Sequence, residues 1–326
     1  MEKFIKKQKV SELKDGDTVD EVFFVKFKKG VNPYAKGFLF ALTLSDNSGR
    51  SIEYKYWGNR DETKVKTLYD YIKPDSIVHV QGKVASYNGN LQLTTNEPNV
   101  IEVLEKGQYD EADFIKSAKK DKDMMYSQLL KTIEIVENPK LKDLLNRIFK
   151  NPGIEAKFKN HPGAIEIHHD WIGGLLQHTL EVLDYCKLSW ELFPQLNKDL
   201  IITGGLLHDI GKLEELDVTS RIKGTNKGQL TGHLVLSTIF VSNKCDEVGL
   251  DEELKDKLLH IIISHHGKLE FGSPKEPMFP EALVVCYADA LSAKLAGMIE
   301  FVDSAKSSTE DDFMYDRRGA KNIFLK

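Results

Sequence analysis

The spacing of apolar residues changes once along the chain, and this change constrains the fold more than any other feature. In the first third, apolar residues come in short runs that alternate with polar ones, as in Val19 to Lys28. From Met124 onward they recur every three or four residues. A period of two is typical of half-buried strands, and a period of 3.6 is typical of amphipathic helices. The sequence therefore predicts a β domain followed by a helical domain, a multidomain α+β chain.

Five runs in the first third have the composition of strands, with turn residues between them. Asn88-Gly89 is a hairpin signal between the last two runs, and the spacing of Asp61 to Ile72 is helical. The predicted strands are 19–28, 37–44, 51–57, 76–84 and 91–95. Five short strands with one helix between the third and the fourth is the order of an OB-fold β-barrel.

The remaining two thirds predict an all-α helical bundle. Gly and Pro separate the helical patterns, as at Asn151-Pro152-Gly153. The predicted helices are 124–136, 139–150, 172–191, 197–208, 231–247, 251–264 and 280–300. We place the domain boundaries at 1–105 for the barrel, 106–125 for a polar linker and 126–326 for the bundle.

Charge and cysteine content exclude some classes of protein. Lys and Arg total 45 against 50 Asp and Glu, a net charge of −5. This balance argues against a protein that holds nucleic acid by bulk charge, but it leaves room for a local basic groove. Cys186, Cys245 and Cys286 are far apart and form no Cys-x-x-Cys pair, so we expect neither a disulfide framework nor a thiolate zinc site. A reduced, cytoplasmic location fits this usage.

Neither a secretory signal nor a membrane span is expected. Met1 to Lys7 is charged and lacks the apolar run of a signal peptide. The most apolar stretch, Leu258 to Ile263, has the length of a helix core. No stretch approaches the ~20 apolar residues that cross a bilayer, so we predict no membrane partner.

Histidines and acids are gathered in the helical domain. His178, the pair His208-Asp209, and Asp289 lie on three separate apolar helices. His168, His169, His233, His265 and His266 lie in the same domain. One histidine on an apolar helix is more often a packed core residue, but an ionised Asp buried alone is costly and needs a partner. Imidazole and carboxylate together suit Zn, Mn, Fe or Co, so the combination favours a metal site built inside the bundle.

Three segments of the helical domain resemble a known family. They are 168–178 with its Gly173-Gly174, Leu206 to Lys212, and the long His265 to Met278. These segments resemble the HD domain of metal-dependent phosphohydrolases. The whole chain resembles the YhaM-type 3′→5′ exoribonucleases of Gram-positive bacteria, in which an OB-fold precedes an HD domain. The resemblance covers nearly the full chain and implies a homo-oligomer.

The resemblance implies a ligand set for two metal ions per subunit. One ion would be held by His178, His208, Asp209 and Asp289; the second by His233 and His265, with Asp209 as the bridge. His266 either ligates or faces the scissile phosphate. Two ions about 3.5–4 Å apart clamp a phosphoryl group and lower the pKa of a water between them. We expect Mn²⁺, with Co²⁺, Fe²⁺ or Zn²⁺ as alternatives.

Cationic and polar side chains next to these ligands are candidates for contact with the phosphate. Lys212 lies three residues after Asp209 of the His208-Asp209 pair and can stabilise charge in the transition state. The alternative is that Lys212 is a solvated lysine after a helix end. We assign catalytic roles to Lys212, His266 and Asp209, and phosphate contacts to His169 and Lys268.

Aromatic residues and lysines are interleaved on the predicted strands, as in Tyr54-Lys55-Tyr56-Trp57. OB-folds bind single strands by stacking bases on aromatic rings along a basic groove. Alternate residues face opposite sides of a strand, so half of these aromatics belong to the core, and the pattern leaves open which half. Tyr34, in the predicted loop Gly30 to Lys36, is the best surface candidate, with Lys36 and Trp57 beside it in the predicted substrate-binding set. The alternative is a barrel used for oligomer contacts.

The leading functional prediction is a metal-dependent 3′→5′ exoribonuclease. It would hydrolyse single-stranded RNA, with single-stranded DNA as a second substrate, to nucleoside 5′-monophosphates. One alternative is an HD phosphodiesterase acting on a nucleotide or cyclic dinucleotide, because the fuller histidine set occurs there too. The other is a non-catalytic RNA-binding protein with a structural metal.

Overall fold

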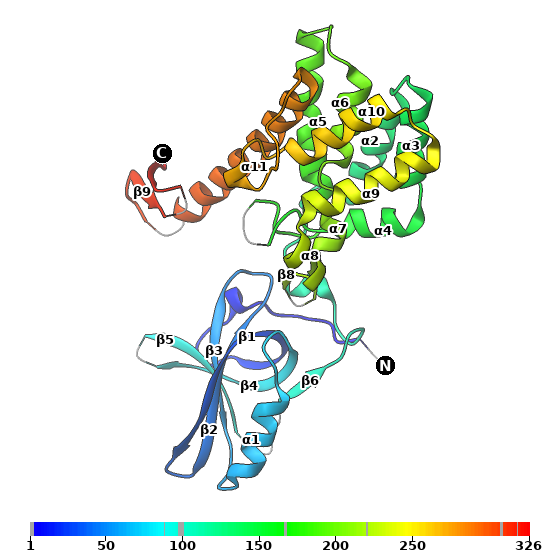
Figure 1. Ribbon diagram of the computed structural model, residues 1–326. Helices are drawn as coiled ribbons and strands as arrows, with labels where there is room; N and C mark the ends of the chain where they lie inside the picture. The colour runs from blue at the N-terminus through cyan, green and yellow to red at the C-terminus, as the bar shows by residue number, and fades with distance from the viewer. Residues whose placement is uncertain are drawn as a thin grey trace. The chain divides into compact units, whose positions relative to one another are not determined.

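The computed structural model describes residues 3–87, 89–96, 101–165, 168–219, 221–306, 309–317 and 319–326. The chain forms two compact units (Figure 1). The first is Met1–Lys116 with Val218–Arg221, and the second is Ser117–Asp217 with Ile222–Lys326. The first unit is rich in strands and the second in helices, which confirms the predicted fold class.

The first unit is a sheet that closes into a ring. Its strands are β1 (Thr18–Tyr34), β2 (Gly37–Ser45), β3 (Ser51–Trp57), β4 (Ile77–Tyr87), β5 (Asn90–Asn96) and β6 (Glu102–Leu104). They lie in the order β1-β2-β3-β5-β4-β6, and β1 also pairs with β4. Helix α1 (Glu62–Tyr71) stands between β3 and β4 in the chain, and the Asp61 side chain accepts from the backbone N–H of Lys64 at its start. This is an OB-like arrangement. In the predicted β4–β5 hairpin turn, Asn88 lies outside the described residues.

Strand alternation divides the aromatic residues between core and surface. Tyr54 and Tyr56 are buried in the centre of the sheet unit, and the Tyr56 ring stacks on Phe40 at 5.0 Å between centroids. Lys55 and Trp57, which point the other way, are only half-buried. The surface candidates therefore include Trp57 but exclude both β3 tyrosines.

The predicted loop Gly30 to Lys36 is largely strand, which corrects that prediction. β1 continues to Tyr34, and only Ala35 and Lys36 form the turn into β2. The register shifts between Lys29 and Asn32, so a bulge absorbs the extra residue and lets pairing resume. Turn residues such as Gly30 mark bulges as well as loops, which is why composition misplaced the strand end.

The second unit contains all seven predicted helices. They are α2 (Lys122–Glu134), α3 (Pro139–Phe149), α5 (Gly174–Leu192), α6 (Lys198–Leu207), α9 (His233–Val248), α10 (Glu252–Ser264) and α11 (Pro280–Lys306). α6 is the central helix, because every residue from Leu200 to Leu207 is buried. Because this helix is buried, His208 at its C-terminal end lies in the interior of the bundle.

Shorter elements in the helical unit were not predicted. Helix α4 (Pro152–Asn160) begins where we predicted only punctuation: the Asn151 side chain accepts from Gly153 and Ile154, and Pro152 takes the first helical position, where its missing N–H is harmless. Helices α7 (Lys212–Glu215) and α8 (Asn226–Thr231) flank the hairpin β7 (Leu216–Val218) and β8 (Ile222–Gly224). A second hairpin, β9 (Phe313–Asp316) and β10 (Lys321–Phe324), follows α11. The bundle is therefore helical with two small hairpins.

Helix α11 is long and apolar enough to cross a membrane by length and composition, which the sequence analysis did not anticipate. In its most apolar window, 28% of the residues are buried. Core helices of bundles meet the same test, and α11 packs on α5, α6 and α10. The absence of a membrane partner stays a prediction.

Strand β5 supplies a test of the sheet core. Leu93 is fully buried, whereas Leu91, on the same face but next to the start of the strand, is 38% exposed. We expect Leu93→Ala to lower the free energy of unfolding of the sheet unit by about 2–5 kcal/mol, because it leaves a cavity. Leu91→Ala should cost roughly 0.5 kcal/mol or less. Calorimetric unfolding of both variants measures the difference; equal costs would contradict the closed core.

Candidate metal centre

Helix α5 and the end of helix α6 bring His178, His208 and Asp209 together. His178 lies on α5, and His208 and Asp209 follow the end of α6. The Nε2 atoms of the two histidines are 3.4 Å apart. Oδ2 of Asp209 lies 3.5 Å from Nε2 of His178 and 3.4 Å from Nε2 of His208. Asp289, on α11, places Oδ1 3.1 Å from Nε2 of His178. We call His178, His208 and Asp209, all buried, the histidine–aspartate cluster.

A second group of histidines meets the other oxygen of Asp209. His233 begins α9, and His265 and His266 follow the end of α10. Oδ1 of Asp209 lies 3.5 Å from Nε2 of His233 and 3.6 Å from Nε2 of His265. Nε2 of His266 is 3.3 Å from that of His233. We call His233, His265 and His266 the three-histidine cluster. Each carboxylate oxygen of Asp209 therefore faces one cluster.

The histidine rings are held so that Nε2 points into the centre. Each Nδ1 has an oxygen partner: Gly205 O for His208 at 2.8 Å, Ile262 O for His265 at 2.6 Å, Phe271 O for His266 at 2.9 Å, Ser292 Oγ for His178 at 3.0 Å and Glu215 Oε1 for His233 at 3.1 Å. When Nδ1–H donates to such an oxygen, Nε2 keeps its lone pair and becomes the ligand atom. All five rings are therefore oriented as metal ligands.

Orphaned polar atoms test whether these residues fit a metal. Within the described residues, Oδ1 of Asp209 and Nε2 of His265 are buried and have no hydrogen-bond partner. Leaving such atoms unpaired is costly, and a cation between them removes the cost. Imidazole with carboxylate is the donor set of divalent transition metals. The residues therefore fit divalent metal, which Asp209 and the histidines of the two clusters would hold.

Charge keeps the ligands in the protonation state that metals require. Burial alone would raise the pKa of the Asp209 carboxyl, but Lys212 and His208 outweigh it and hold that pKa well below its ordinary value. Nζ of Lys212 lies 2.7 Å from Oδ2 of Asp209. Burial lowers the pKa of His265 to about 4. At neutral pH the carboxylate is therefore ionised and this imidazole neutral.

Glycines let the ligand-bearing segments approach one another. A side chain at Gly211 would meet the backbone O of His233 and the backbone N of Ser237, both at 2.5 Å from its Cβ. A side chain at Gly174 would meet the backbone O of His169 at 2.0 Å. Gly211 therefore allows α9 to bring His233 to the HD pair, and Gly174 allows the preceding loop to cross the start of α5.

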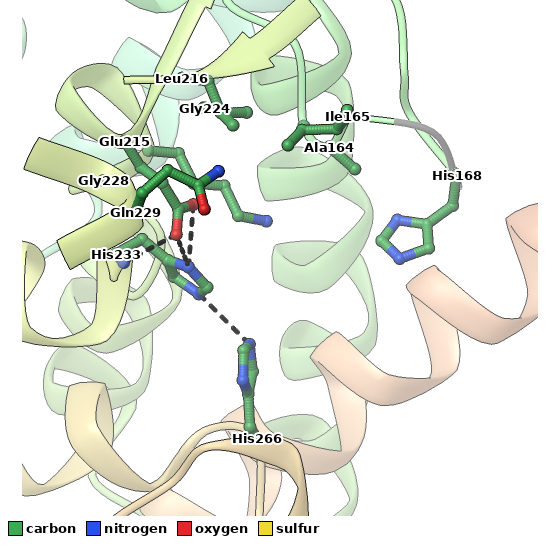
Figure 2. A pocket seen from close by; sticks show the side chains of 12 residues that line it. Ala164, Ile165, His168, Glu215, Leu216, Gly224, Gly228, Gln229, His233 and His266 are labelled. Atoms are coloured by element: carbon green, nitrogen blue, oxygen red, sulfur yellow. Dashed lines mark hydrogen bonds and ion pairs between the residues drawn. The ribbon is translucent and has the colours of Figure 1, made fainter. Parts of the chain in front are cut away.

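An open pocket of about 670 Å³, the metal pocket, leads to the centre. Figure 2 shows Glu215 against His233, with His266 below them and His168 on the far side. Lys212 also lines the pocket, together with apolar side chains of Ala164, Ile165 and Leu216. The pocket therefore combines one lysine and candidate metal ligands with apolar surface.

Two residues predicted to contact the phosphate, His169 and Lys268, do not line the metal pocket, and their role stays a prediction. His169 is fully buried, and its Nε2 lies 2.9 Å from Oε2 of Glu181. Lys268 is exposed, lies 3.5 Å from Glu270 Oε1, and does not line the metal pocket. The sequence placed both next to metal-ligand motifs, but the turns at these positions direct them elsewhere.

The barrel candidates Tyr34, Lys36 and Trp57 lie at one place on the sheet unit. The rings of Tyr34 and Trp57 meet edge to face at 4.9 Å between centroids, and the Tyr34 hydroxyl donates to Gly58 O at 2.9 Å. Lys36 is exposed in the adjoining turn. Two other lysines of these strands, Lys29 and Lys55, both pair with Glu53.

Three polar residues around the ligands were not predicted from the sequence, and His168, at the pocket wall, was named there without a role. The Glu215 carboxylate contacts Nδ1 of His233. Ser292 Oγ contacts Nδ1 of His178 and donates to the Glu181 carboxylate at 2.8 Å. His168 lines the metal pocket. Glu215 lies one helical turn after Lys212, a spacing that could have marked it. No sequence pattern links Glu181 to Ser292, which lie 111 residues apart.

Residues 175–294 match the model of the HD domain. The helical fold and the ligand series thus define a metal-dependent phosphohydrolase of the HD class, with divalent metal as its cofactor. The chain is also 34% identical over 306 residues to the 3′-5′ exoribonuclease YhaM of Bacillus subtilis (strain 168). That match covers 93% of this chain and 94% of the relative. The chain belongs to the YhaM family.

Solved structures show only weak likeness. A p204 HINb domain matches with a TM-score of 0.24 and 20% identity, covering 30% of this chain and 46% of the other. A murine DNA-binding protein bound to double-stranded DNA matches with a TM-score of 0.22 and 16% identity, covering 31% of this chain and 49% of the other. The chain spans less than half the length of either structure.

Glu215 supplies a test of the three-histidine cluster. We expect Glu215→Ala to weaken binding of one of two metal ions by about 10–100-fold, because His233 loses the partner that orients it. Titration with Mn²⁺ by calorimetry measures both affinities. The control is Glu214→Ala, since Glu214 pairs with Lys227. An unchanged Glu215→Ala titration would remove this role.

Proposed function

We propose that the protein is a cytoplasmic, Mn²⁺-dependent 3′→5′ exonuclease that shortens single-stranded RNA and releases nucleoside 5′-monophosphates. One observation carries the proposal: a single buried carboxylate, Asp209, faces two histidine clusters with its two oxygens. Such a geometry suits two ions acting on one phosphoester. The relationship to an exoribonuclease over nearly the full chain favours RNA as the polymer. All three cysteines are free and buried, in keeping with a reducing compartment.

When bound, the pair of divalent ions supplies Lewis acidity and lowers the pKa of water at the centre. The rest of the chemistry belongs to this chain. Asp209 would be shared by the two ions, while His178, His208 and Asp289 would hold one and His233 and His265 would hold the other. His266, whose Nε2 lies 3.3 Å from that of His233, would complete the second set. Lys212, beside Asp209, places a fixed positive charge where negative charge develops on the phosphate.

The sheet unit supports a polymer rather than a small nucleotide as substrate. Tyr34 and Trp57 form an aromatic pair on its surface, with the Lys36 cation beside them. Bases of any identity stack on such rings, and a nearby cation attracts the backbone. We assign this surface to RNA upstream of the reacting end. The homo-oligomer stays a prediction of the family resemblance, measurable by light scattering.

The direct test gives purified protein a 5′-labelled single-stranded RNA in the presence of Mn²⁺. We expect stepwise shortening from the 3′ end and release of 5′-monophosphates. RNA that stays intact while a cyclic dinucleotide is opened would favour a small-substrate phosphodiesterase. RNA that is retained without reaction would favour a non-catalytic binding protein. A matched DNA strand measures the preference between sugars.

Asp209→Ala should reduce turnover of RNA by about a thousandfold or more, because neither ion position keeps its shared ligand. Binding of RNA should remain, since Tyr34, Lys36 and Trp57 are unchanged. Single-turnover kinetics and a filter-binding assay separate the two effects. The matched control is Asp256→Ala, at an exposed position of α10. Substantial turnover by Asp209→Ala would remove Asp209 from the bridging role.

A further inference from the structure

A second pocket shares a wall with the metal pocket. It has a volume of about 370 Å³ and lies between α11 and the β9–β10 hairpin. We call it the hairpin groove, and define it by Lys294, Met298, Phe301, Lys321 and Ile323. His168 lines both pockets. The two pockets therefore meet at His168.

The hairpin groove starts next to the metal ligand of α11. Ala293, Gly297 and Phe301 follow Asp289 at intervals of four residues, so they share one face of the helix with it. At 1.5 Å per residue they lie about 6, 12 and 18 Å along the axis from Asp289. The small side chains of Ala293 and Gly297 leave room along this face. A chain that leaves the metal centre along α11 therefore enters the groove within one helical turn.

The charges of the groove suit a phosphate. Lys294 and Lys321 are both exposed, and neither forms an ion pair within the part of the chain that the structure describes. The one acid in the lining, Asp316, accepts from the backbone N–H of Gly319 at 3.0 Å and lies opposite Lys321 in the hairpin, so the two lysines leave a net positive charge of one. Phe301 and the buried Ile323 add apolar surface. Cations above an apolar floor are what a phosphate with its attached base requires.

The metal pocket has the opposite character at its outer end. Ala164, Ile165 and Leu216 are apolar there, and the acidic Glu215, which contacts His233, precedes Leu216 in the chain. This lining accepts the base and ribose of a terminal nucleotide, which has no further phosphate on its 3′ side. A phosphate beyond the centre in that direction would meet the Glu215 carboxylate. The strand on the 5′ side carries a phosphate at every step and fits the hairpin groove instead.

His168 provides a polar group at the junction. Its ring centroid is 6.4 Å from that of His178, so it stands beside the histidine–aspartate cluster. Its Nδ1 is buried and has no hydrogen-bond partner among the described residues. Its backbone has a positive φ of 39°, an uncommon conformation for a residue with a side chain. A substrate at the junction would give this atom a partner.

We propose that the hairpin groove binds the nucleotide on the 5′ side of the scissile phosphate, with Lys294 and Lys321 contacting the backbone of a single-stranded nucleic acid. This inference rests on the proposed exonuclease function and assigns its upstream subsite. The terminal nucleotide then lies in the metal pocket, and the nucleotide on its 5′ side lies in the hairpin groove.

The test compares two substrates on the Mn²⁺-loaded protein. One is a single-stranded RNA oligomer; the other is the p-nitrophenyl ester of uridine 5′-monophosphate, which has no nucleotide on the 5′ side. For the double variant Lys294→Ala with Lys321→Ala, we expect KM for RNA to rise about tenfold. The slope of log KM against log salt should fall by about 0.7 for each lysine removed. The loss of kcat/KM for the ester should be much smaller than that for RNA.

Two controls bracket this result. Lys294→Arg with Lys321→Arg keeps the charge and should restore most of the affinity for RNA. Lys187→Ala removes a lysine of α5 that lines neither pocket and lies 3.9 Å from Glu191; it should leave KM and the salt slope unchanged. Circular dichroism checks that each variant is folded.

The outcomes separate this inference from the proposed function. If the wild type shortens RNA and the double variant has an unchanged KM and salt slope, or loses ester and RNA hydrolysis equally, the groove is not an upstream subsite. The exonuclease proposal then stands. If the wild type cleaves the ester but no RNA, both proposals fall.

Discussion

The carboxylate of Asp209 is buried between two sets of histidines, and the helical unit is organised around this group. An ionised carboxylate in an apolar interior is costly unless cations or donors surround it. Lys212 provides one cation at 2.7 Å, and the histidines on either side provide the donor set for others. Because the ligands come from α5, α9, α11 and the ends of α6 and α10, those elements must converge on one point. The buried apolar length of α6 places that point inside the bundle.

Local charge, rather than net charge, decides where a polyanion can bind this chain. The net charge of −5 gives no attraction at long range, and on the sheet unit Glu53 neutralises part of the interleaved lysine pattern. Lys212, Lys294 and Lys321 lie in pockets instead. A cation in a concave site acts over a short distance on a correctly placed phosphate. Binding by shape and stacking with a few cations is consistent with this distribution.

Periodicity predicted the elements well, because it reports directly which face of a strand or helix is buried. It separated Tyr54 and Tyr56 from Lys55 and Trp57, although only the closed sheet shows which pair is inside. It failed where one residue type serves two structures. Gly30 indicated a loop but lies in a bulged strand, and Pro152 indicated a break but begins a helix.

That the candidate ligands lie together was predictable, because the family resemblance gives both their residue types and their order along the sequence. The positions of their neighbours were not predictable. His169 stands next to a ligand motif, but a positive φ of 60° and the pair with Glu181 direct it into the core. Glu181 and Ser292 meet only because α5 packs against α11. Such pairs depend on tertiary packing, which one sequence does not reveal.

The orientation of the ligand rings divides them into two kinds. His208 and His265 stand at the ends of α6 and α10, where the last carbonyls of a helix lack backbone donors. Their Nδ1 atoms meet carbonyls three residues earlier, Gly205 O and Ile262 O, so the helix end itself fixes the ligand. His178 and His233 depend on side chains instead, Ser292 and Glu215. Substitution of Ser292 or Glu215 can therefore alter the orientation of one ligand without disturbing a helix. The two histidines at helix ends, His208 and His265, fix the position of the centre. The metal affinity of the centre can change through the side chains that orient His178 and His233.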